Sequence, residues 1–342
     1  MTEGPQPHSV DHLAAMQQML TGYELSQALF AVAATEIPTV LDRAGTLTLK
    51  DLAERAGVDH DALARLVRLL VTHGVFHLSG DRVSLTELGS TLSVDHPRSL
   101  HGIAIGAKNL HYLPFSELEH TLRTGQSAAS KFYGVPYFEW ISADPARTAL
   151  FQGAMATFMK TLRKGIFDNY RLPAGEVIAD IGGGSGHVLI DLLSRPENEH
   201  RRGILFDLPE VVDGIRAAMP ASGPGDRIEL VGGSFFEAVP TADIYLLGWV
   251  LHDWNDSDAQ RILTTIARAA RPGARLVVVE GIVPDGDQAH PIKAMDVTML
   301  AILGGQERTE EQYRRLLATA RFNVDAVVPT PSPFSVLEAT LR

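Results

Sequence analysis

From residue 176 onward the sequence alternates short apolar runs with stretches of helical periodicity, and this alternation limits the possible folds more than any other feature. A helical stretch at 259–270 ends before Pro272-Gly273, as helices commonly do. Such alternation predicts an α/β fold, a Rossmann-like doubly wound parallel sheet with helices on both faces. The apolar runs have the length of buried strands and cover residues 177–181, 203–206, 228–231, 244–247 and 276–279.

The first hundred residues follow a different pattern. Residues before about Thr21 predict a loose tail, and residues 23–41 predict one helix with an apolar face. Two short helices separated by Gly57 come next, and a hairpin with the turn Ser79-Gly80-Asp81 follows them. Two helices followed by a hairpin are typical of a winged helix.

A winged helix can read DNA or can serve as a packing and dimerisation module. A DNA-reading helix needs groups that contact bases and phosphates, and a basic surface around them. The second short helix has a nearly balanced set of charges instead, and the whole chain has 30 Lys and Arg against 41 Asp and Glu, a net charge of -11. The sequence therefore favours a dimerisation module, with neither nucleic acid nor an anionic membrane as a partner.

Composition excludes further classes of site. The chain has 0 Cys, so disulfide frameworks, thiolate zinc sites and cysteine nucleophiles are excluded together. No run approaches the roughly 18 apolar residues that a membrane helix needs, and the N-terminus lacks the pattern of a secretory signal, so we expect a cytoplasmic protein. Residues 1–105 predict the winged-helix domain, residues 106–172 a helical connector and residues 173–342 the α/β domain.

A glycine-rich loop, Gly182 to Gly186, follows the first strand of the α/β domain. In such sheets a ligand approaches the backbone at this place. The dinucleotide fingerprint requires a third glycine where His187 stands, which disfavours a nicotinamide cofactor. The next strand ends in Asp207, a carboxylate suited to a ribose diol. Loop and acid together predict a nucleoside ligand, and the alternative is that these glycines only permit tight packing of strand and helix.

His252 lies just beyond the fourth strand, where ligands bind in sheets of this kind. Its unperturbed pKa of about 6.5 allows it to take up a proton near neutral pH. A single histidine is more often structural than catalytic, but three carboxylates, Asp253, Glu280 and Glu307, could orient this ring. We therefore interpret His252 as a candidate general base.

Five motifs in order resemble one enzyme family. The chain is similar, over nearly its whole length, to the S-adenosylmethionine-dependent small-molecule O-methyltransferases of the plant caffeate and bacterial polyketide-tailoring type. This resemblance implies a class I methyltransferase domain preceded by a winged-helix dimerisation domain. The motifs are Val-Ile-Ala-Asp-Ile-Gly-Gly-Gly-Ser-Gly at 177–186, Phe-Asp-Leu-Pro-Glu-Val at 206–211, Val-Gly-Gly-Ser-Phe-Phe at 231–236, Leu-His-Asp-Trp at 251–254 and Gly-Gly-Gln-Glu-Arg-Thr at 304–309.

The resemblance also implies a cofactor site for S-adenosylmethionine, which becomes S-adenosylhomocysteine in the reaction. Gly182 and Gly184 would lie against the amino-acid part of the cofactor and Asp207 at its ribose. Ser234 and Phe235 would lie at the adenine. The other cofactor-binding positions implied by the family are Asp180, Leu208, Gly233, Gly248 and Trp249.

The family further implies that His252 is the general base and that Glu280 and Glu307 hold it in place, with Asp253 beside it. The reaction would transfer a methyl group to a hydroxyl of an aromatic or polyketide-like secondary metabolite, without a metal, in a homodimer. The acceptor pocket would be lined partly by the helical connector, and core packing is the alternative role for its methionines. The implied pocket residues are Met155, Phe158, Met159, Trp249, Met295, Asp296 and Met299.

Two other functions remain open from the sequence. A relative that keeps the cofactor could catalyse hydroxylation, decarboxylation or a pericyclic step, and a winged-helix regulator could use the α/β domain as a sensor. The complete set of His252, Glu280 and Glu307 favours methylation, because a phenol with a pKa near 10 is a poor nucleophile at neutral pH until a base takes its proton.

Three positions depart from the family pattern. Ser234 stands where the family usually has Asp, and Gly248 stands where plant members have Lys. Both would lie beside the adenosine, so we expect a change in cofactor affinity. Arg321 replaces the Gly of the usual Ala-Gly-Phe at a helix end.

Overall fold

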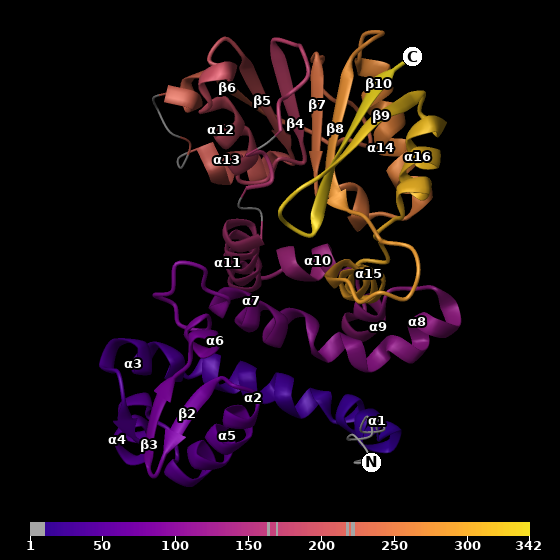
Figure 1. Ribbon diagram of the computed structural model, residues 1–342. Helices are drawn as coiled ribbons and strands as arrows, with labels where there is room; N and C mark the ends of the chain where they lie inside the picture. Colours follow the sequence, from indigo (N-terminus) through magenta and orange to yellow (C-terminus); the bar gives the residue numbers. More distant parts are fainter. Residues whose placement is uncertain (1–10, 163–164, 169, 217–218, 220–222) are drawn as a thin grey trace, which may run out of the picture. The chain divides into compact units, whose positions relative to one another are not determined.

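The computed structural model describes residues 11–162, 165–168, 170–216, 219 and 223–342 (Figure 1). The chain forms two compact units. One unit comprises Met1–Leu113 and Ile141–Thr161, and the other comprises Pro114–Trp140 and Leu162–Arg342. The expected boundaries at 105 and 172 remain a prediction, but the expected connector contributes segments to both units.

The second unit is built on a 7-stranded sheet with the order β6-β5-β4-β7-β8-β10-β9 (Figure 1). All five strands expected from the apolar runs are present and parallel, which confirms the doubly wound fold. The C-terminal pair was not predicted, and it is antiparallel because only the short connection 330–333 joins its strands. The strands are β4 (Val177–Ile181), β5 (Arg202–Asp207), β6 (Ile228–Gly232), β7 (Ile244–Gly248), β8 (Arg275–Gly281), β9 (Phe322–Pro329) and β10 (Phe334–Leu341).

Helices cover both faces of this sheet. Alternate strand residues such as Tyr245 and Val278 form one hydrophobic core with α14 and α16. On the opposite face a Cβ on Gly203 would meet Leu189 of α12 at 2.8 Å, so the absence of a side chain there lets α12 pack closely. The helices of this unit around the sheet are α12 (His187–Leu193), η3 (Pro196–Asn198), α13 (Pro209–Arg216), η4 (Gly223–Arg227), η5 (Leu251–Asp253), α14 (Asp256–Ala269), α15 (Pro291–Ile302) and α16 (Glu310–Thr319).

The strand register brings the candidate site residues to one edge of the sheet. Ile181 pairs with Phe206, Asp207 with Gly232, and Gly248 with Val279. The residues that follow these strands therefore leave the sheet at the same carboxyl edge. In open α/β sheets this edge is where ligands bind.

The first unit contains the expected helix–turn–helix and hairpin. Its small sheet has the order β1-β3-β2, and Val32, Leu52, Val67 and Val83 belong to its hydrophobic core. The winged-helix prediction is confirmed at the level of these elements. They are α1 (His12–Leu20), α2 (Gly22–Ala34), α3 (Ile37–Ala44), β1 (Leu47–Thr48), α4 (Leu49–Ala56), α5 (His60–Thr72), β2 (Phe76–Ser79), β3 (Arg82–Leu85) and α6 (Glu87–Ser90).

Two predictions for this unit were wrong in detail. The single helix expected at 23–41 is two helices, because Glu36 adopts a left-handed conformation with φ 54° and Pro38 then starts the next helix. The tail expected before Thr21 contains helix α1 within the described residues. Asp11 caps it by accepting hydrogen bonds from the N–H groups of Leu13 and Ala14.

The segment between the winged helix and the large sheet is helical, as expected. Ser127 caps α9, and its hydroxyl also donates to the carbonyl of Ile302 at the end of α15 at 2.8 Å. None of the described helices is both long and apolar enough to cross a membrane. The elements here are α7 (His101–Gly106), the π-helix η1 (Ala107–His111), η2 (Leu113–Glu117), α8 (Leu118–Thr124), α9 (Ala128–Tyr133), α10 (Tyr137–Ser142) and α11 (Pro145–Leu162).

Arg321, which replaces the family glycine, adopts φ 68° after α16. This left-handed conformation costs a residue with a side chain roughly 1–2 kcal/mol, which explains why glycine suits the position. The backbone there is held by hydrogen bonds from Arg321 N–H to the carbonyl of Ala318 and from Arg342 N–H to the carbonyl of Arg321. These contacts hold the substituted residue in the unusual conformation.

Candidate active site

The glycine loop after β4 requires glycine at two positions for different reasons. Gly182 and Gly184 have φ 72° and 53°, a region that other residues rarely adopt. A Cβ on Gly182 would lie 2.9 Å from Cγ2 of Val250, whereas a Cβ on Gly184 would meet nothing within 4 Å. Tight packing therefore accounts for Gly182, and the space beside Gly184 is open to a ligand.

Asp207 connects the loop to the end of β5. Its Oδ2 accepts a hydrogen bond from Gly184 N–H at 2.8 Å, and its Oδ1 accepts one from Leu208 N–H at 2.7 Å. Burial raises the pKa of Asp207, and these two N–H groups act in the opposite direction. Each carboxylate oxygen has a further lone pair, so Asp207 can also accept from ribose hydroxyls.

The segment after β6 lies against Asp207. Gly233 N–H donates to the Asp207 carbonyl at 2.9 Å, and a Cβ on Gly233 would lie 2.8 Å from the Phe206 ring. The Ser234 hydroxyl accepts from Phe236 N–H at 3.3 Å, which stabilises a local turn. The Phe235 ring approaches the glycine loop, since a Cβ on Gly182 would lie 3.7 Å from its Cε1. The structure therefore places 233–235 beside the loop and Asp207.

Trp249 follows β7 with φ 56°, an unusual conformation for a residue with a side chain. Such strain occurs often at functional sites. Trp249 is 7% exposed, and its ring packs edge-on against Phe334 with centroids 5.2 Å apart, so packing accounts for most of the surface of this residue. At Gly248, which precedes it, an added Cβ would meet nothing within 4 Å. Asp180, another predicted cofactor residue, is buried in β4, and an added Cβ on Gly183 would lie 2.8 Å from its Cγ.

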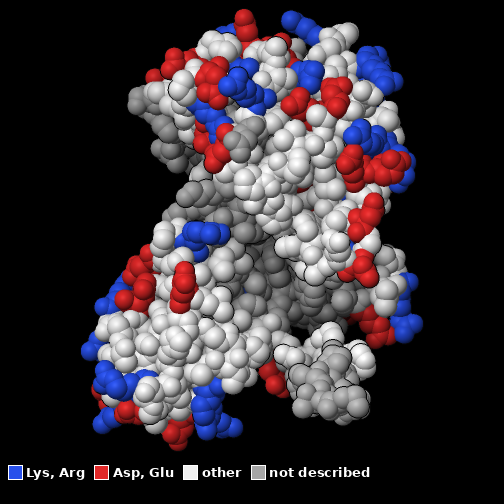
Figure 2. Space-filling model, viewed as in Figure 1, with Lys and Arg blue, Asp and Glu red and all other residues white. Residues whose placement is uncertain are grey.

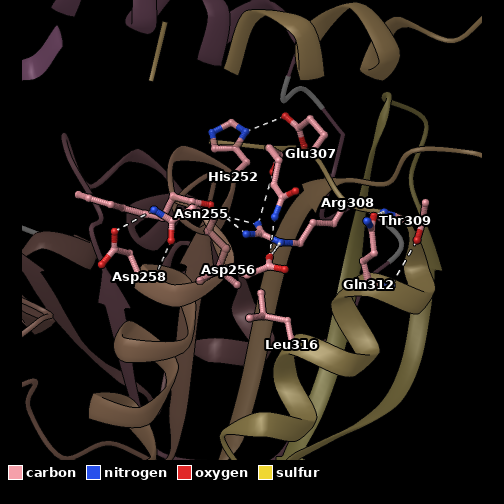
Figure 3. A network of polar contacts seen from close by, with 12 residues as sticks. His252, Asn255, Asp256, Asp258, Glu307, Arg308, Thr309, Gln312 and Leu316 are labelled. Carbon is pink, nitrogen blue, oxygen red and sulfur yellow. Dashed lines mark hydrogen bonds and ion pairs between the residues drawn. The ribbon is translucent and has the colours of Figure 1, made fainter. Parts of the chain in front are cut away.

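The candidate base, His252, is buried in the short turn η5. Its Nδ1 lies 2.7 Å from Oε1 of Glu307 (Figure 3). An ionised carboxylate only accepts hydrogen bonds, so Nδ1 is the donor. Its Nε2 lies 3.3 Å from Oδ1 of Asp253, and Oε2 of Glu280 lies 3.6 Å from Nδ1. The three predicted carboxylates thus surround the ring.

These carboxylates make the imidazole a stronger base. Burial by itself lowers the pKa of His252, but the charges of Glu280 and Asp253 and the hydrogen bond to Glu307 outweigh it and raise this pKa to about 10. Burial raises the pKa of Glu280 to about 7 and that of Asp253 to about 6. The site therefore holds protons more firmly than separate histidine and carboxyl groups do.

Within the described part of the chain, three of these side chains lie close enough together to hold a metal ion. One ligand atom each from His252, Glu280 and Glu307 lies within 4.8 Å of the others. However, the Nδ1 that would face a metal already donates a proton to Glu307. The hydrogen-bonded arrangement is therefore suited to moving a proton.

Two contacts near the base were missed by sequence reasoning. Arg308 is 0% exposed, and its guanidinium reaches the loop that bears His252 (Figure 3). Asp296, predicted to line the acceptor pocket, accepts a hydrogen bond from Glu307 N–H at 2.8 Å. The capping box of Thr309 and Gln312 was an available signal, because it starts α16 and fixes the residues just before the helix.

The predicted pocket residues lie on two helices. Met295, Asp296 and Met299 are half-buried on α15 in the second unit. Met155 and Phe158 are half-buried on α11 in the first unit, and the side chain of Met159 lies outside the described residues. The acceptor-pocket assignment remains a prediction.

The fold and site together define a class of protein, a doubly wound α/β protein that holds a buried imidazole among carboxylates at the carboxyl edge of its sheet. A family model described as the O-methyltransferase domain matches residues 115–323, and one described as the O-methyltransferase dimerisation domain matches residues 17–95. The chain therefore belongs to the O-methyltransferase family, which confirms the resemblance.

Particular relatives extend over nearly the whole chain. Phenazine O-methyltransferase PhzM of Lysobacter antibioticus is 33% identical over 342 residues, which cover 99% of each chain. Aclacinomycin 10-hydroxylase RdmB of Streptomyces purpurascens is 34% identical over 310 residues, covering 87% of this chain and 82% of that protein. NcsB1, an O-methyltransferase from neocarzinostatin biosynthesis, was crystallised with S-adenosylmethionine and 2-hydroxy-5-methyl naphthoic acid. Its structure has a TM-score of 0.80, 32% identity, and coverage of 93% of this chain and 96% of that chain.

Proposed function

We propose that this chain transfers a methyl group from S-adenosylmethionine to a hydroxyl of an aromatic or polyketide-like metabolite, with His252 as the general base. The observation that carries this proposal is the buried imidazole of His252, held 2.7 Å from Glu307 at the sheet edge where Asp207 also lies. A base is needed because a phenol is largely protonated at neutral pH.

The residues at the sheet edge fit the cofactor. Gly184 leaves open space beside the backbone, and Asp207 has lone pairs for the two ribose hydroxyls. When bound, S-adenosylmethionine supplies a methyl group already activated by its sulfonium. The protein's part is to hold the acceptor oxygen in line with that methyl group, an effect that can supply about 7 to 11 kcal/mol in favourable cases.

His252 can take the proton of the acceptor hydroxyl at Nε2. Glu307 fixes the proton on Nδ1, which leaves Nε2 as the basic atom. The raised pKa of His252, about 10, matches the pKa of a phenol, so proton transfer between them is nearly balanced in free energy. Asp253 beside Nε2 is half-buried and offers the proton a route to solvent.

The direct test is incubation of the protein with labelled S-adenosylmethionine and a panel of phenolic metabolites, with and without EDTA. We expect an acceptor to gain one labelled methyl group, equally in the presence of the chelator. A panel in which no hydroxyl compound gains a methyl group, although the protein binds the cofactor, would contradict the proposal.

Hydroxylation is the second candidate function, and the similarity to a hydroxylase, RdmB, is the observation that favours it. The same mass measurement separates the two reactions, because hydroxylation adds an unlabelled oxygen and leaves the label on the cofactor. The carboxylates around His252 favour methylation, since they strengthen the base that a methyl acceptor needs.

The pH dependence follows from the cluster around His252. At neutral pH both the acceptor hydroxyl and the imidazole are protonated, and one of these two protons must leave before methyl transfer. We therefore expect kcat/KM to rise with pH from 7 towards the raised pKa of His252, about 10. Glu307→Gln removes a negative charge and leaves only a neutral amide oxygen to accept the hydrogen bond from Nδ1, and this lowers the pKa of His252. We expect the midpoint of the pH profile to fall by about one unit or more.

Measurement of kcat/KM against pH for both proteins, with one acceptor, checks this expectation. The titration of the acceptor itself is common to both profiles and cannot produce a difference. Identical midpoints would show that Glu307 does not support the base.

Ser234 provides a smaller test of the cofactor site. An Asp at 234 could accept from the adenine amine as a charged group, which contributes roughly 1.5 to 3 kcal/mol, against about 0.5 to 1.5 for a hydroxyl. It could also keep the hydrogen bond from Phe236 N–H. We expect Ser234→Asp to tighten S-adenosylmethionine binding by about fivefold in calorimetry. Unchanged or weaker binding would remove residues 234 and 235 from the adenine site.

We also propose that the chain forms a homodimer. The match to a dimerisation domain at 17–95 supports a homodimer, and the apolar side chains Leu13, Met16 and Leu20 of α1 are exposed in the single chain. We expect sedimentation to give twice the chain mass of 37.1 kDa at micromolar concentration. A 37.1 kDa species under these conditions would contradict the homodimer.

A further inference from the structure

The turn that carries His252 is held at its beginning by a buried acid. Oε1 of Glu280 accepts hydrogen bonds from the N–H groups of Val250, Leu251 and His252, at 3.1, 2.8 and 3.4 Å. Glu280 lies farther from the imidazole, with its Oε2 3.6 Å from Nδ1, whereas Oε1 of Glu307 lies 2.7 Å from the same nitrogen. The hydrogen bonds of Glu280 therefore hold the backbone of the turn, whereas the hydrogen bond of Glu307 holds the ring.

A buried cation, Arg308, holds carbonyl groups of the same turn. Nη1 of Arg308 donates to the carbonyl of Leu251 at 2.9 Å, and Nη2 donates to the carbonyl of Trp254 at 2.9 Å. Nε donates to Oδ1 of Asp256 at 2.9 Å, which fixes the plane of the guanidinium (Figure 3). Both side chains, Glu280 and Arg308, are 0% exposed.

The segment bearing Arg308 is itself fixed to the end of β8. Ile282 and Arg308 form a parallel bridge, and Val283 N–H donates to the carbonyl of Arg308 at 3.0 Å. Gln306 N–H donates to the carbonyl of His252 at 2.9 Å. At Gly305 an added Cβ would lie 2.1 Å from that same carbonyl oxygen, so the two segments are in direct contact.

We propose that Arg308 is a positioning residue for the base, and that Glu280 and Arg308 form a clamp of opposite charges on the η5 turn. The carboxylate accepts from the N–H groups of Val250, Leu251 and His252. The guanidinium donates to the carbonyls of Leu251, the first residue of the turn, and of Trp254, the residue that follows it. This arrangement complements the dipole of a helical turn. The proposal rests on the proposed role of His252 as base.

The geometry also explains why this position has Arg. A buried charge is costly unless all its hydrogen-bonding groups have partners. The planar fork of a guanidinium reaches two carbonyls and a carboxylate together, whereas the ammonium of Lys is a point charge. Arg308→Lys should therefore hold these carbonyls only partly, and Arg308→Met should not hold them at all.

The first measurement is amide hydrogen exchange in the full-length protein without ligands. We expect faster exchange of a peptide covering 249–255 in Arg308→Lys, and a larger change in Arg308→Met, with β4 and β7 unchanged. Arg315→Lys is the matched control, because Arg315 is an exposed arginine on α16 that pairs with Glu311. Exchange that is faster throughout the sheet, or unchanged at 249–255, would overturn the clamp.

The second measurement is steady-state methyl transfer per folded enzyme. We expect kcat to fall roughly 10-fold to 100-fold in Arg308→Met, with a smaller fall in Arg308→Lys, since small displacements of a catalytic group are this costly. KM for the acceptor and affinity for S-adenosylmethionine should stay within about threefold. A wild-type kcat in both variants, or an equal loss of cofactor binding, would show that Arg308 does not position the base.

The two measurements separate this inference from the proposed function. Hydrogen exchange reports on the turn whether or not the protein is a methyltransferase. Faster exchange at 249–255 would therefore support the backbone contacts of Arg308 even if no acceptor is methylated, and the absence of methylation would contradict the proposed function alone. Should Arg308→Met fail to fold, the graded comparison of Arg308→Lys with Arg315→Lys still decides the result.

Discussion

His252→Ala is expected to lower the rate of methyl transfer by about 100-fold to 10,000-fold, the range typical of losing a general base. Cofactor affinity should change little, because the imidazole contacts Glu307, Asp253 and Glu280 and not the glycine loop. Single-turnover transfer to a phenolic acceptor measures the first quantity, and calorimetry with S-adenosylmethionine measures the second.

The alanine substitution also leaves three carboxyl groups close together without their cation. Their repulsion raises their pKa values further, and part of any loss could come from rearrangement of the cluster. His252→Asn is the matched control, because its amide can still donate to Glu307 but cannot accept a proton at neutral pH. Both variants should lose the same large factor.

A pH series adds an independent criterion for the same role. As the pH approaches the pKa of the acceptor hydroxyl, about 10 for a phenol, the acceptor loses its proton without help. The deficit of both His252 variants should then shrink. A deficit that is constant across the pH range, or a wild-type rate at neutral pH, would mean that His252 does not remove the proton.

The sequence pattern predicted the parallel sheet because buried parallel strands are continuous apolar runs. The same reasoning did not identify β9 and β10, because buried and exposed residues do not alternate strictly along these two strands, and their place in the sheet depends on the pairing of β10 with β8. The helix expected at 23–41 is interrupted by the left-handed backbone of Glu36, and Pro38 starts a new helix. The periodicity of apolar residues does not detect such a break.

The candidate site was predictable where a residue lies at the end of a strand. His252, Glu280 and Asp207 follow or end β7, β8 and β5, and parallel strands bring such positions to one edge. The division of work between Glu280 and Glu307 could not be predicted, because it depends on which carboxylate oxygen meets which N–H. Arg308 was missed for a similar reason: its partners are backbone carbonyls, which every residue has.

Asp207→Ala is expected to weaken S-adenosylmethionine binding by on the order of 100-fold, or about 3 kcal/mol. The substitution leaves two ribose hydroxyls without their charged acceptor, and it also removes the partner of Gly184 N–H, which Asp207 holds at 2.8 Å. Asp213→Ala is the matched control, since Asp213 is an exposed carboxylate on α13 that pairs with Arg216. Calorimetry on both variants should show a large loss only for Asp207→Ala.

The two causes of this loss can be separated with a ligand that lacks the ribose hydroxyls. If Asp207 binds the ribose, the wild-type protein should bind 2′,3′-dideoxy-S-adenosylhomocysteine weakly, and Asp207→Ala should weaken that binding far less than it weakens S-adenosylhomocysteine. The interaction energy of this cycle isolates the contact between carboxylate and ribose from the effect on the loop. Equal losses for both ligands would mean that Asp207 serves only to hold the glycine loop, and that the ribose lies elsewhere.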